Sequence, residues 1–413
     1  MAAMLNPFKT CLGAGAPRAC RIALLIGAVC SIPAASAAPG DEGLDVMAGL
    51  GYFHDDNLFR LPDGQPGFEG RRSDSARQAH AGLVFNKTYG RQNIVAQAKI
   101  TKVEFDHFDQ LDYDGKDLQA RWNWQLGNRF DGVLGAHYLQ TLAPYTDFRS
   151  NERNLREHRR QFFDGAWRFH PSWRARTAAS HDTYQYELLA QRFNNRAEDA
   201  VEVGADYLPR SGSTVGLVAR RIKGEYDNRR VFGGLALDER FTQDELKARI
   251  HWIASGSSTV QVLAGHARRT YRARSERDAS GFNGRITASH QPRGKMRYTA
   301  AAWREFSAVE SNVISYSLNR GASIGATWDA RAKVRVEANA SYEQRAYNAR
   351  VPLSGAQDLD DSLKQASLAA TWTPRRSLAL TAALAHQRRS GSPFLGLGKF
   401  KANTVSLVAN AQF

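Results

Sequence analysis

Lysine and arginine side chains recur at alternate positions in several segments of this sequence, and their chemistry is the binding of anions. Side chains two residues apart on a strand share one face. The cations that share the polar face of the expected strands are Arg121, Arg174, Arg176, Lys247, Arg249, Arg285, Arg297, Lys333 and Arg335. Fewer acids lie on that face: Asp182, Glu245 and Glu337. If this face lines a pore, it predicts a preference for anions. Alternatively, these cations pair with acids and stiffen a wall.

Other site chemistry finds little support in the sequence. The 11 histidines include no H-x-x-x-H pair, and no G-x-S-x-G segment marks a nucleophile. Asp109, Asp112 and Asp114 could bind calcium, but their spacing departs from an EF-hand and favours a hydrated hairpin tip. We therefore expect no enzyme, no catalytic residue, no metal site, no cofactor and no nucleic-acid partner.

The segment DLQARWNWQLGNRFDGVLGAHYL, residues 117–139, shows which elements must position the cations. Leu118, Ala120, Trp122, Trp124 and Leu126 alternate with Gln119, Arg121, Asn123 and Gln125. The same alternation returns in residues 245–252, 282–289, 333–343 and 365–372. A period of two predicts strands with one apolar and one polar face, so each strand separates a greasy environment from water.

Tight breaks alternate with long ones along the chain. The short breaks, rich in Gly, Pro, Asn and Ser, fall at residues 89–91, 127–129, 171–172, 209–213, 254–258, 292–294, 329–331 and 374–377. The long breaks include residues 55–76, 143–160, 227–240 and 348–362. Tight turns at one rim and long loops at the other are typical of a transmembrane barrel. We expect an all-β fold: an antiparallel up-and-down transmembrane barrel of about 18 strands.

Large aromatic residues lie beside the short breaks rather than in the middle of the strands. They are Trp124, Phe130, Phe169, Trp173, Tyr207, Trp252, Tyr298, Trp328 and Trp372. A soluble β-sandwich would collect such side chains in its core, whereas a membrane barrel places them in a girdle where lipid meets water. In lipid, backbone polar groups must pair within the protein, so a sheet crosses only when it closes on itself.

The first 37 residues have the features of an export signal, with basic residues, an apolar stretch and the small-residue motif Ala35-Ser36-Ala37. We therefore expect residues 1–37 to be a cleaved signal peptide and residues 38–413 to form the barrel. The three cysteines all lie in the removed part. The formal net charge of +15 suggests a negatively charged partner. The last nine residues, VSLVANAQF, alternate and end on Phe413, which resembles the C-terminal signal that barrel-insertion machinery recognises.

The segment YFHDDNLFRLPDG, residues 52–64, is the most distinctive stretch of the chain. Its acidic and amide residues suit a turn closed by side-chain oxygens, and the apolar residues between them need cover. The motif residues are Asp55, Asp56, Asn57, Leu58, Phe59 and Arg60. We expect this first loop to fold inward and narrow the pore, with Phe59 and Leu61 against the wall.

This motif resembles the D-D-N-L-F-R-L element of EpsL-type outer-membrane proteins associated with exopolysaccharide biosynthesis. The resemblance implies an outer-membrane component of exopolysaccharide synthesis and export in a Gram-negative bacterium, and it implies no catalytic residues. A related group of barrel porins also begins with an aromatic residue followed by D-D-N. The first interpretation is therefore a water-filled export channel with a basic lumen; the alternative is a general or anion-preferring porin.

These interpretations carry expectations about partners. Outer-membrane lipid and lipopolysaccharide should surround the barrel, and the basic segment RSNERNLREHRR, residues 149–160, is a candidate contact with lipopolysaccharide phosphate. An export role would add anionic polysaccharide and periplasmic export components. Monomer and trimer both fit the sequence pattern.

Overall fold

The computed structural model describes residues 42–413 except residues 229, 233–234, 274, 293, 310–313, 350–359 and 392–397. The expected signal peptide, residues 1–37, lies outside the described residues. Within them, three short 3-10 helices interrupt the loops: η2 (Asp109–Leu111), η3 (Leu189–Asn194) and η4 (Ser275–Arg277). Among the described residues, no helix is long and apolar enough to cross a membrane.

All other regular structure in the described part of the chain is β. The strands are β1 (Gly43–Asp55), β2 (Asp74–Tyr89), β3 (Gln92–Phe105), β4 (Tyr113–Leu126), β5 (Phe130–Leu142), β6 (Leu155–His170), β7 (Trp173–Tyr186), β8 (Arg196–Tyr207), β9 (Thr214–Tyr226), β10 (Arg230–Phe232), β11 (Leu235–Leu237), β12 (Phe241–Ser255), β13 (Ser258–Tyr271), β14 (Ala279–His290), β15 (Met296–Ala308), β16 (Ile314–Arg331), β17 (Val334–Ala349), β18 (Asp360–Arg375), β19 (Leu378–Arg389) and β20 (Phe400–Gln412). The small β10–β11 hairpin stands apart from the main sheet.

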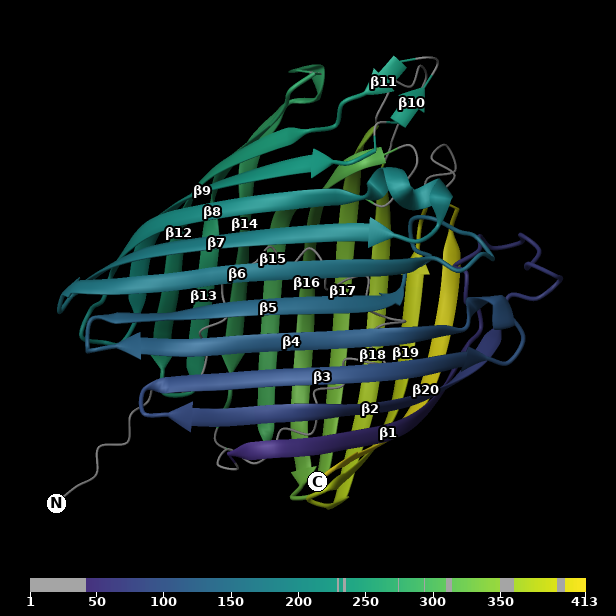
Figure 1. Cartoon of the computed structure of the whole chain (residues 1–413), viewed down its shortest axis with the longest axis horizontal. Helices are drawn as coiled ribbons and strands as arrows, with labels where there is room; N and C mark the ends of the chain where they lie inside the picture. The colour runs from purple at the N-terminus through teal and green to yellow at the C-terminus, as the bar shows by residue number, and fades with distance from the viewer. Residues whose placement is uncertain are drawn as a thin grey trace.

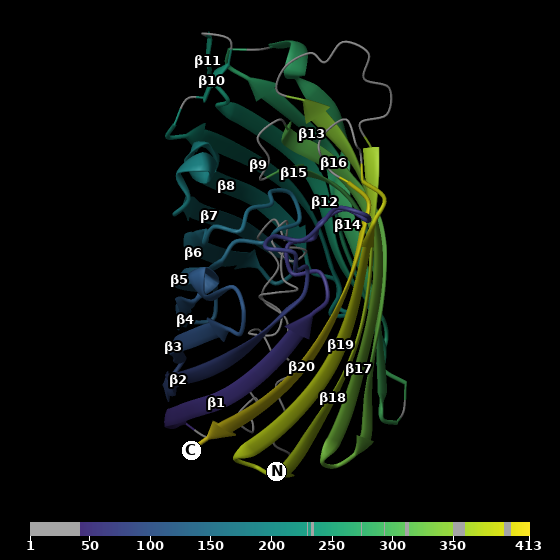
Figure 2. The same cartoon turned by 90° about the vertical axis from the view of Figure 1, so that its right-hand side faces the viewer.

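The main sheet closes into a barrel of 18 antiparallel strands. Consecutive strands pair with each other, β9 pairs with β12, and β1 pairs with β20 to complete the circle. The expected all-β barrel of about 18 strands is confirmed. Figure 1 shows β1 to β9 running across the view in front of β13 to β20, which run nearly vertically behind them. Figure 2 shows the two walls facing each other, with the segment after β1 lying between them.

Short turns join the strands at one rim and long loops join them at the other. Gly90 and Gly127 occupy two of the short turns with φ of 61° and 59°, a left-handed conformation that glycine adopts without steric cost. β1 begins and β20 ends at the rim of the short turns, and the Phe413 N–H donates to the Val46 carbonyl at 2.9 Å.

Several expected boundaries were wrong, and three of them have reasons local to each one. The seventh turn lies at residues 332–333, not 329–331, because a register shift after Trp328 lets β16 continue to Arg331. Pro374 belongs to β18, where it stands beside another register shift near the end of the strand. The long break after β5 ends at Asn154 rather than Arg160, because β6 extends into the basic segment.

The outward face of the barrel is apolar along the middle of the strands. Large apolar side chains point outward and are exposed, among them Leu50 at 67%, Leu217 at 63% and Ile324 at 61%. Of the nine aromatic residues beside the short breaks, all but Trp124 are at least 40% exposed. A continuous exposed apolar surface of this kind requires a nonaqueous environment.

The pairing between β14 and β15 is the shortest among the described ladders of the barrel. It has seven residue pairs, from Gly284 with Arg304 to His290 with Tyr298. On its other side β14 pairs with β13 up to Ala279, and β15 pairs with β16 up to Ala308. Beyond the ladder, the Arg304 guanidinium donates to the Phe282 carbonyl. At the long-loop rim, the ends of β14 and β15 are therefore joined by a side chain in place of a backbone ladder.

A lipid-facing charge should destabilise the barrel according to its depth. Leu384 faces outward in the middle of β19, and the Leu384→Arg variant should lose about 2–4 kcal/mol of unfolding free energy. His386→Arg, on the same face but nearer the long-loop rim, should cost about 0–1 kcal/mol. Urea unfolding in lipid vesicles measures both, and equal costs would contradict a lipid-facing outer surface.

Candidate functional site

The polar residues of the first-loop motif are held by the barrel wall. The Asp55 carboxylate accepts from the Arg60 guanidinium at 2.8 Å, and its second oxygen accepts from the Thr404 hydroxyl at 2.8 Å. The Arg60 Nε also donates to Gln387 at 2.9 Å. Asp55 and Arg60 are 1% and 3% exposed, so this ion pair is almost completely buried. The pair fixes the start of the loop against β19 and β20.

Asn57 and Asp56 fasten the same loop through the backbone. The Asn57 amide donates to the carbonyls of Leu61 and Lys401, and its oxygen accepts from the Leu61 N–H, each at 2.9 Å. The Asp56 carboxylate accepts from the backbone and side chain of Asn403 at 2.7 and 2.6 Å. Arg60 has φ of 54°, a conformation unusual for a residue with a side chain. The bonds around the turn compensate for that strain.

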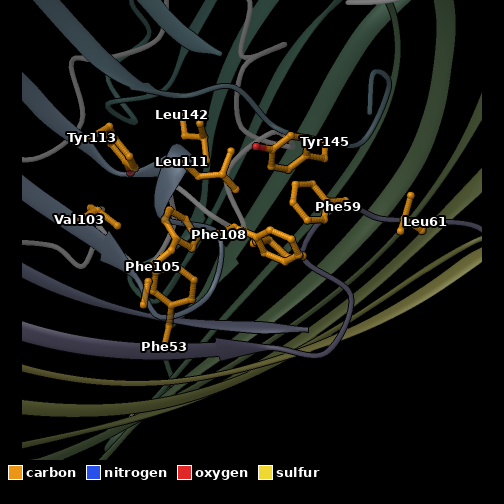
Figure 3. Close-up of a cluster of buried hydrophobic side chains, with 12 residues drawn as sticks. Phe53, Phe59, Leu61, Val103, Phe105, Phe108, Leu111, Tyr113, Leu142 and Tyr145 are labelled. Atoms are coloured by element: carbon orange, nitrogen blue, oxygen red, sulfur yellow. The ribbon is translucent and has the colours of Figure 1, made fainter. Parts of the chain in front are cut away.

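The apolar motif residues form the centre of a buried cluster inside the barrel mouth. Leu58 and Phe59 are 0% exposed and Leu61 is 2% exposed. Figure 3 shows Phe59 beside Tyr145 and Phe108, with ring centroids 5.0 and 4.8 Å away. Phe59 thus packs against residues of two other loops, within a cluster that also contains the strand residues Phe53, Val103 and Phe105.

The loop between β5 and β6, residues 143–154, crosses to the far wall. Its Asp147 carboxylate lies 3.2 Å from the Arg345 guanidinium of β17 and 3.1 Å from that of Arg389 on β19. Asp361 on β18 contacts the same two guanidinium groups. Two carboxylates and two guanidinium groups therefore form one compact cluster, which we call the latch: Asp147, Arg345, Asp361 and Arg389.

The latch is balanced in charge and holds the loop in one position. Burial alone would raise the pKa of the Asp147 carboxyl, but the guanidinium groups of Arg345 and Arg389 lower it below its usual value. Asp147 is therefore ionised at neutral pH. Arg389 also donates to the Thr146 carbonyl and, at 2.8 Å, to the Tyr347 hydroxyl.

Arg149 joins this crossing loop to the first one. Its Nε donates to the Arg60 carbonyl at 2.7 Å. Burial and the nearby Arg389 lower the pKa of Arg149 to about 10. The two inward loops, residues 56–73 and 143–154, thus support each other across the mouth of the lumen.

Most of the nine sequence-predicted cations are close to a carboxylate. Arg174 lies 2.6 Å from Asp206, Lys247 2.8 Å from Glu245, Arg285 2.7 Å from Glu305 and Arg335 2.8 Å from Asp329, while Arg176 contacts Asp164 and Arg249 contacts Glu202. This arrangement fits the alternative in which the cations stiffen the wall.

The other three predicted cations have different surroundings. Arg297 donates to the Gln291 amide at 3.3 Å. Lys333 lies in the turn between β16 and β17, not on a strand, and donates to the Pro374 carbonyl at 2.8 Å; its expected place on the lumen face was wrong because the turn is shifted. Arg121 is exposed and lines a cavity on the inner wall.

That cavity has a volume of about 990 Å³ and lies along the inner wall from β2 to β9. Seven arginines line it against three carboxylates, which leaves a positive balance. The arginines are Arg91, Arg121, Arg160, Arg168, Arg174, Arg176 and Arg220, and the acids are Asp131, Asp164 and Glu202. Six side-chain amides also line it: Asn93, Gln97, Gln119, Asn123, Gln125 and Asn128.

The amides form ordered rows at one end of the cavity. Asn123 donates to Asn93 at 3.0 Å, and Asn93 donates to Asn86 at 3.0 Å. Gln97 and Gln119 are direct partners in the β3–β4 register. Amide groups offer both donors and acceptors, which suits the hydroxyl groups of a polar solute, while guanidinium groups suit its carboxylates or phosphates.

The remaining candidate regions have structural roles. Among the described residues, no group of three or more His, Cys, Asp or Glu side chains is placed to hold a metal ion. Asp112, from the acidic hairpin tip, accepts from the Phe105 N–H at 2.7 Å. In the basic segment 149–160, Arg149 turns inward, Arg153 lies 2.7 Å from Glu187 and Arg156 is buried.

Comparisons with known proteins found similarity only in structure. No protein-family model and no curated protein matches the sequence. OccK2 (OpdF) of Pseudomonas aeruginosa is 9% identical, with 90% of this chain and 98% of that chain covered and a TM-score of 0.49. OccK9 (OpdG) of the same organism is 13% identical, with 90% and 100% covered and a TM-score of 0.48. OccAB3 of Acinetobacter baumannii is 11% identical, with 90% and 99% covered and a TM-score of 0.46. Similarity at this level concerns the barrel fold alone.

The closed sheet, the exposed apolar outer face and the aromatic girdle decide the location. The chain is an outer-membrane β-barrel. Membrane lipid therefore surrounds its outward face, and its charged side chains gather at the rims and in the lumen.

The latch should control how far residues 143–154 obstruct the lumen. Asp147→Asn removes the negative charge shared by Arg345 and Arg389, which should weaken the latch by roughly 3 kcal/mol and raise single-channel conductance in a planar bilayer. The control is Asp106→Asn, which neutralises an exposed carboxylate in a loop outside the lumen. Unchanged conductance in Asp147→Asn would show that the loop does not limit ion flow.

Deletion of residues 56–66 tests the first loop in the same assay. It removes Phe59 and Asn57 and with them the centre of the buried cluster. We expect higher single-channel conductance than in the wild type, and an equal conductance would contradict narrowing by this loop.

Proposed function

We propose that the protein is an outer-membrane channel for small anionic solutes that carry hydroxyl groups. The observation that supports this most directly is the cavity on the inner wall, where seven arginines outnumber three carboxylates and six amides lie alongside. A diffusing anion would gain there both a favourable potential and hydrogen bonds that replace its hydration.

The ion pairs of the wall leave arginines available to a solute. Each guanidinium has five N–H donors, and a carboxylate in a pair such as Arg174–Asp206 occupies only some of them. Arg121 is exposed beside Gln119 and Asn123, and among the described residues no carboxylate lies within salt-bridge distance of it. The cavity thus resembles a weak, multidentate anion site, which suits a conducting channel because a solute must also leave.

The mouth of the channel supports passage of small solutes. The loops of residues 56–73 and 143–154 enter the lumen from the long-loop rim and are fixed by buried ion pairs. A path narrowed in this way suits single small molecules better than unselective flow through a wide pore. This favours the anion-preferring channel over the general porin.

Participation in exopolysaccharide export is the second candidate. It is supported by the resemblance of the motif Asp55–Arg60 and by the combination of arginines with amides, which also suits a polymer of acidic sugars. Export of a polymer through the lumen would require both inward loops to move away. That movement would break the ion pairs of the latch and the packing of the apolar cluster. Anionic polysaccharide and periplasmic export components are partners only under this candidate.

Deletion of the gene distinguishes the two candidates. If the protein is a solute channel, the deletion should lower permeability to small anions and leave the amount of surface polysaccharide unchanged. Loss of surface polysaccharide with unchanged solute permeability would favour the export role and contradict the channel proposed first.

The cavity arginines should set ion selectivity. In the Arg121→Gln, Arg168→Gln and Arg220→Gln triple variant, the anion-to-cation permeability ratio should fall about two- to threefold, because charges within a Debye length of the path are removed. The control is Arg77→Gln, whose side chain is on the outside of the barrel and 72% exposed. Reversal potentials in a salt gradient give the ratio, and a ratio unchanged in the triple variant would refute selectivity by this cavity.

A further inference from the structure

Three cations lie side by side on the outer surface at the long-loop rim. Lys364 of β18 is the direct register partner of Arg388 on β19, and Arg388 is the direct partner of Lys401 on β20. All three are exposed and face outward, because Arg389, next to Arg388, faces inward and is fully buried. Neighbouring strands are about 4.8 Å apart, so three positive charges occupy about 10 Å of the barrel's circumference.

This arrangement is unfavourable for the protein alone. Like charges directly opposite each other on neighbouring strands destabilise a sheet. Lys364 lies 5.7 Å from the Tyr342 ring centroid, but none of the three cations has a carboxylate within salt-bridge distance among the described residues. No ion pair among the described residues offsets the charge of this cluster, so an anion from outside the protein would stabilise it.

Three other outward cations near this rim have such an anion within the chain. Lys102 lies 2.8 Å from Glu104, Arg159 lies 2.9 Å from Glu157, and Arg221 lies 2.6 Å from Asp244. These pairs are on β3, β6 and the β9–β12 seam. The carboxylate-paired cations of β3, β6 and the β9–β12 seam thus contrast with Lys364, Arg388 and Lys401.

An apolar row lies directly below the cations on the same three strands. Leu368, Leu384 and Val405 are also register partners, face outward and are 48%, 53% and 45% exposed. Each is four residues from its cation, or about 13 Å along the strand. Trp372 in the girdle is eight residues from Lys364, or about 26 Å, which matches an apolar band about 25 Å tall.

The surface therefore presents positive charge at headgroup level and an apolar wall at acyl-chain level. We propose that this surface, Lys364, Arg388 and Lys401 above Leu368, Leu384 and Val405, binds the phosphorylated headgroup of lipid A in lipopolysaccharide. The long-loop rim faces the outer leaflet, where this lipid lies, because outer-membrane barrels have short turns on the periplasmic side and longer loops on the outside. The proposal depends on the membrane location and not on the proposed channel function.

This assignment replaces the basic segment 149–160 as the lipopolysaccharide contact. In that segment Arg149 donates into the lumen loop, and Arg153 and Arg159 each lie within salt-bridge distance of a glutamate. Lys364, Arg388 and Lys401, which have no carboxylate partner among the described residues, lie instead on the opposite part of the barrel.

The test uses native mass spectrometry to measure the binding of bisphosphorylated lipid A to the detergent-purified full-length barrel. The wild type should retain lipid A, and the K364Q/R388Q/K401Q variant should bind it roughly 100-fold more weakly, because each cation near an anionic lipid surface contributes a factor of about five in affinity and the three factors multiply. The matched control, K102Q/R159Q/R221Q, removes the same charge from carboxylate-paired sites and should bind as the wild type does.

Lipid chemistry provides a second measurement that needs no variant. The wild type should bind dephosphorylated lipid A and phosphatidylglycerol much more weakly than bisphosphorylated lipid A, and inorganic phosphate should not compete at millimolar concentration. The proposal is overturned if the two triple variants bind lipid A equally, or if the wild type does not distinguish lipid A from phosphatidylglycerol. Heat-dependent gel mobility verifies that each variant is folded.

Discussion

Every backbone N–H and C=O within the hydrocarbon must find its partner inside the protein, and the rest of this structure follows from that constraint. A sheet satisfies it only when its first and last strands pair, as β1 and β20 do here. Closure also divides each strand into a face toward lipid and a face toward the lumen. Charged residues within the hydrocarbon depth are thereby confined to the lumen, where the polar cavity and the inward loops lie.

The confinement of charge explains why ion pairs dominate the inner wall. Pairs such as Arg249–Glu202 and Arg285–Glu305 join residues from nearby strands, so that neither charge is left alone on a wall where side chains crowd. The same principle extends to the loops. Asp55 with Arg60 and Asp147 with Arg345 fix segments that would otherwise hang free in water, so the shape of the mouth depends on electrostatic as well as apolar contacts.

The strands and turns could be predicted from sequence because their signals are local. Leu118 to Leu126 alternate within one strand, and Gly90 or Gly127 marks a turn by its own conformational freedom. The faces of Arg174 and Arg249 could be predicted for the same reason, but their partners could not. Asp206 becomes a neighbour of Arg174, and Glu202 a neighbour of Arg249, only once the register of β7, β8 and β12 is fixed.

The latch was beyond prediction for a related reason. Asp147 and Arg389 are 242 residues apart, and nothing in the residues around either one indicates the other. The inward fold of the first loop had a local signal, because Leu58 and Phe59 are apolar residues in a polar loop. The loop that covers them, which contributes Tyr145, had no comparable signal beyond its length.

The short ladder between β14 and β15 gives the wall one compliant seam. Seven residue pairs hold these strands, fewer than in the other described ladders of the barrel, so thermal fluctuations of the circumference should concentrate there. Amide protons of residues 279–283 in β14 and 305–308 in β15 would then exchange with solvent sooner on their facing sides than those of neighbouring seams. A cylinder that is stiff everywhere except along one line can widen without breaking its closure.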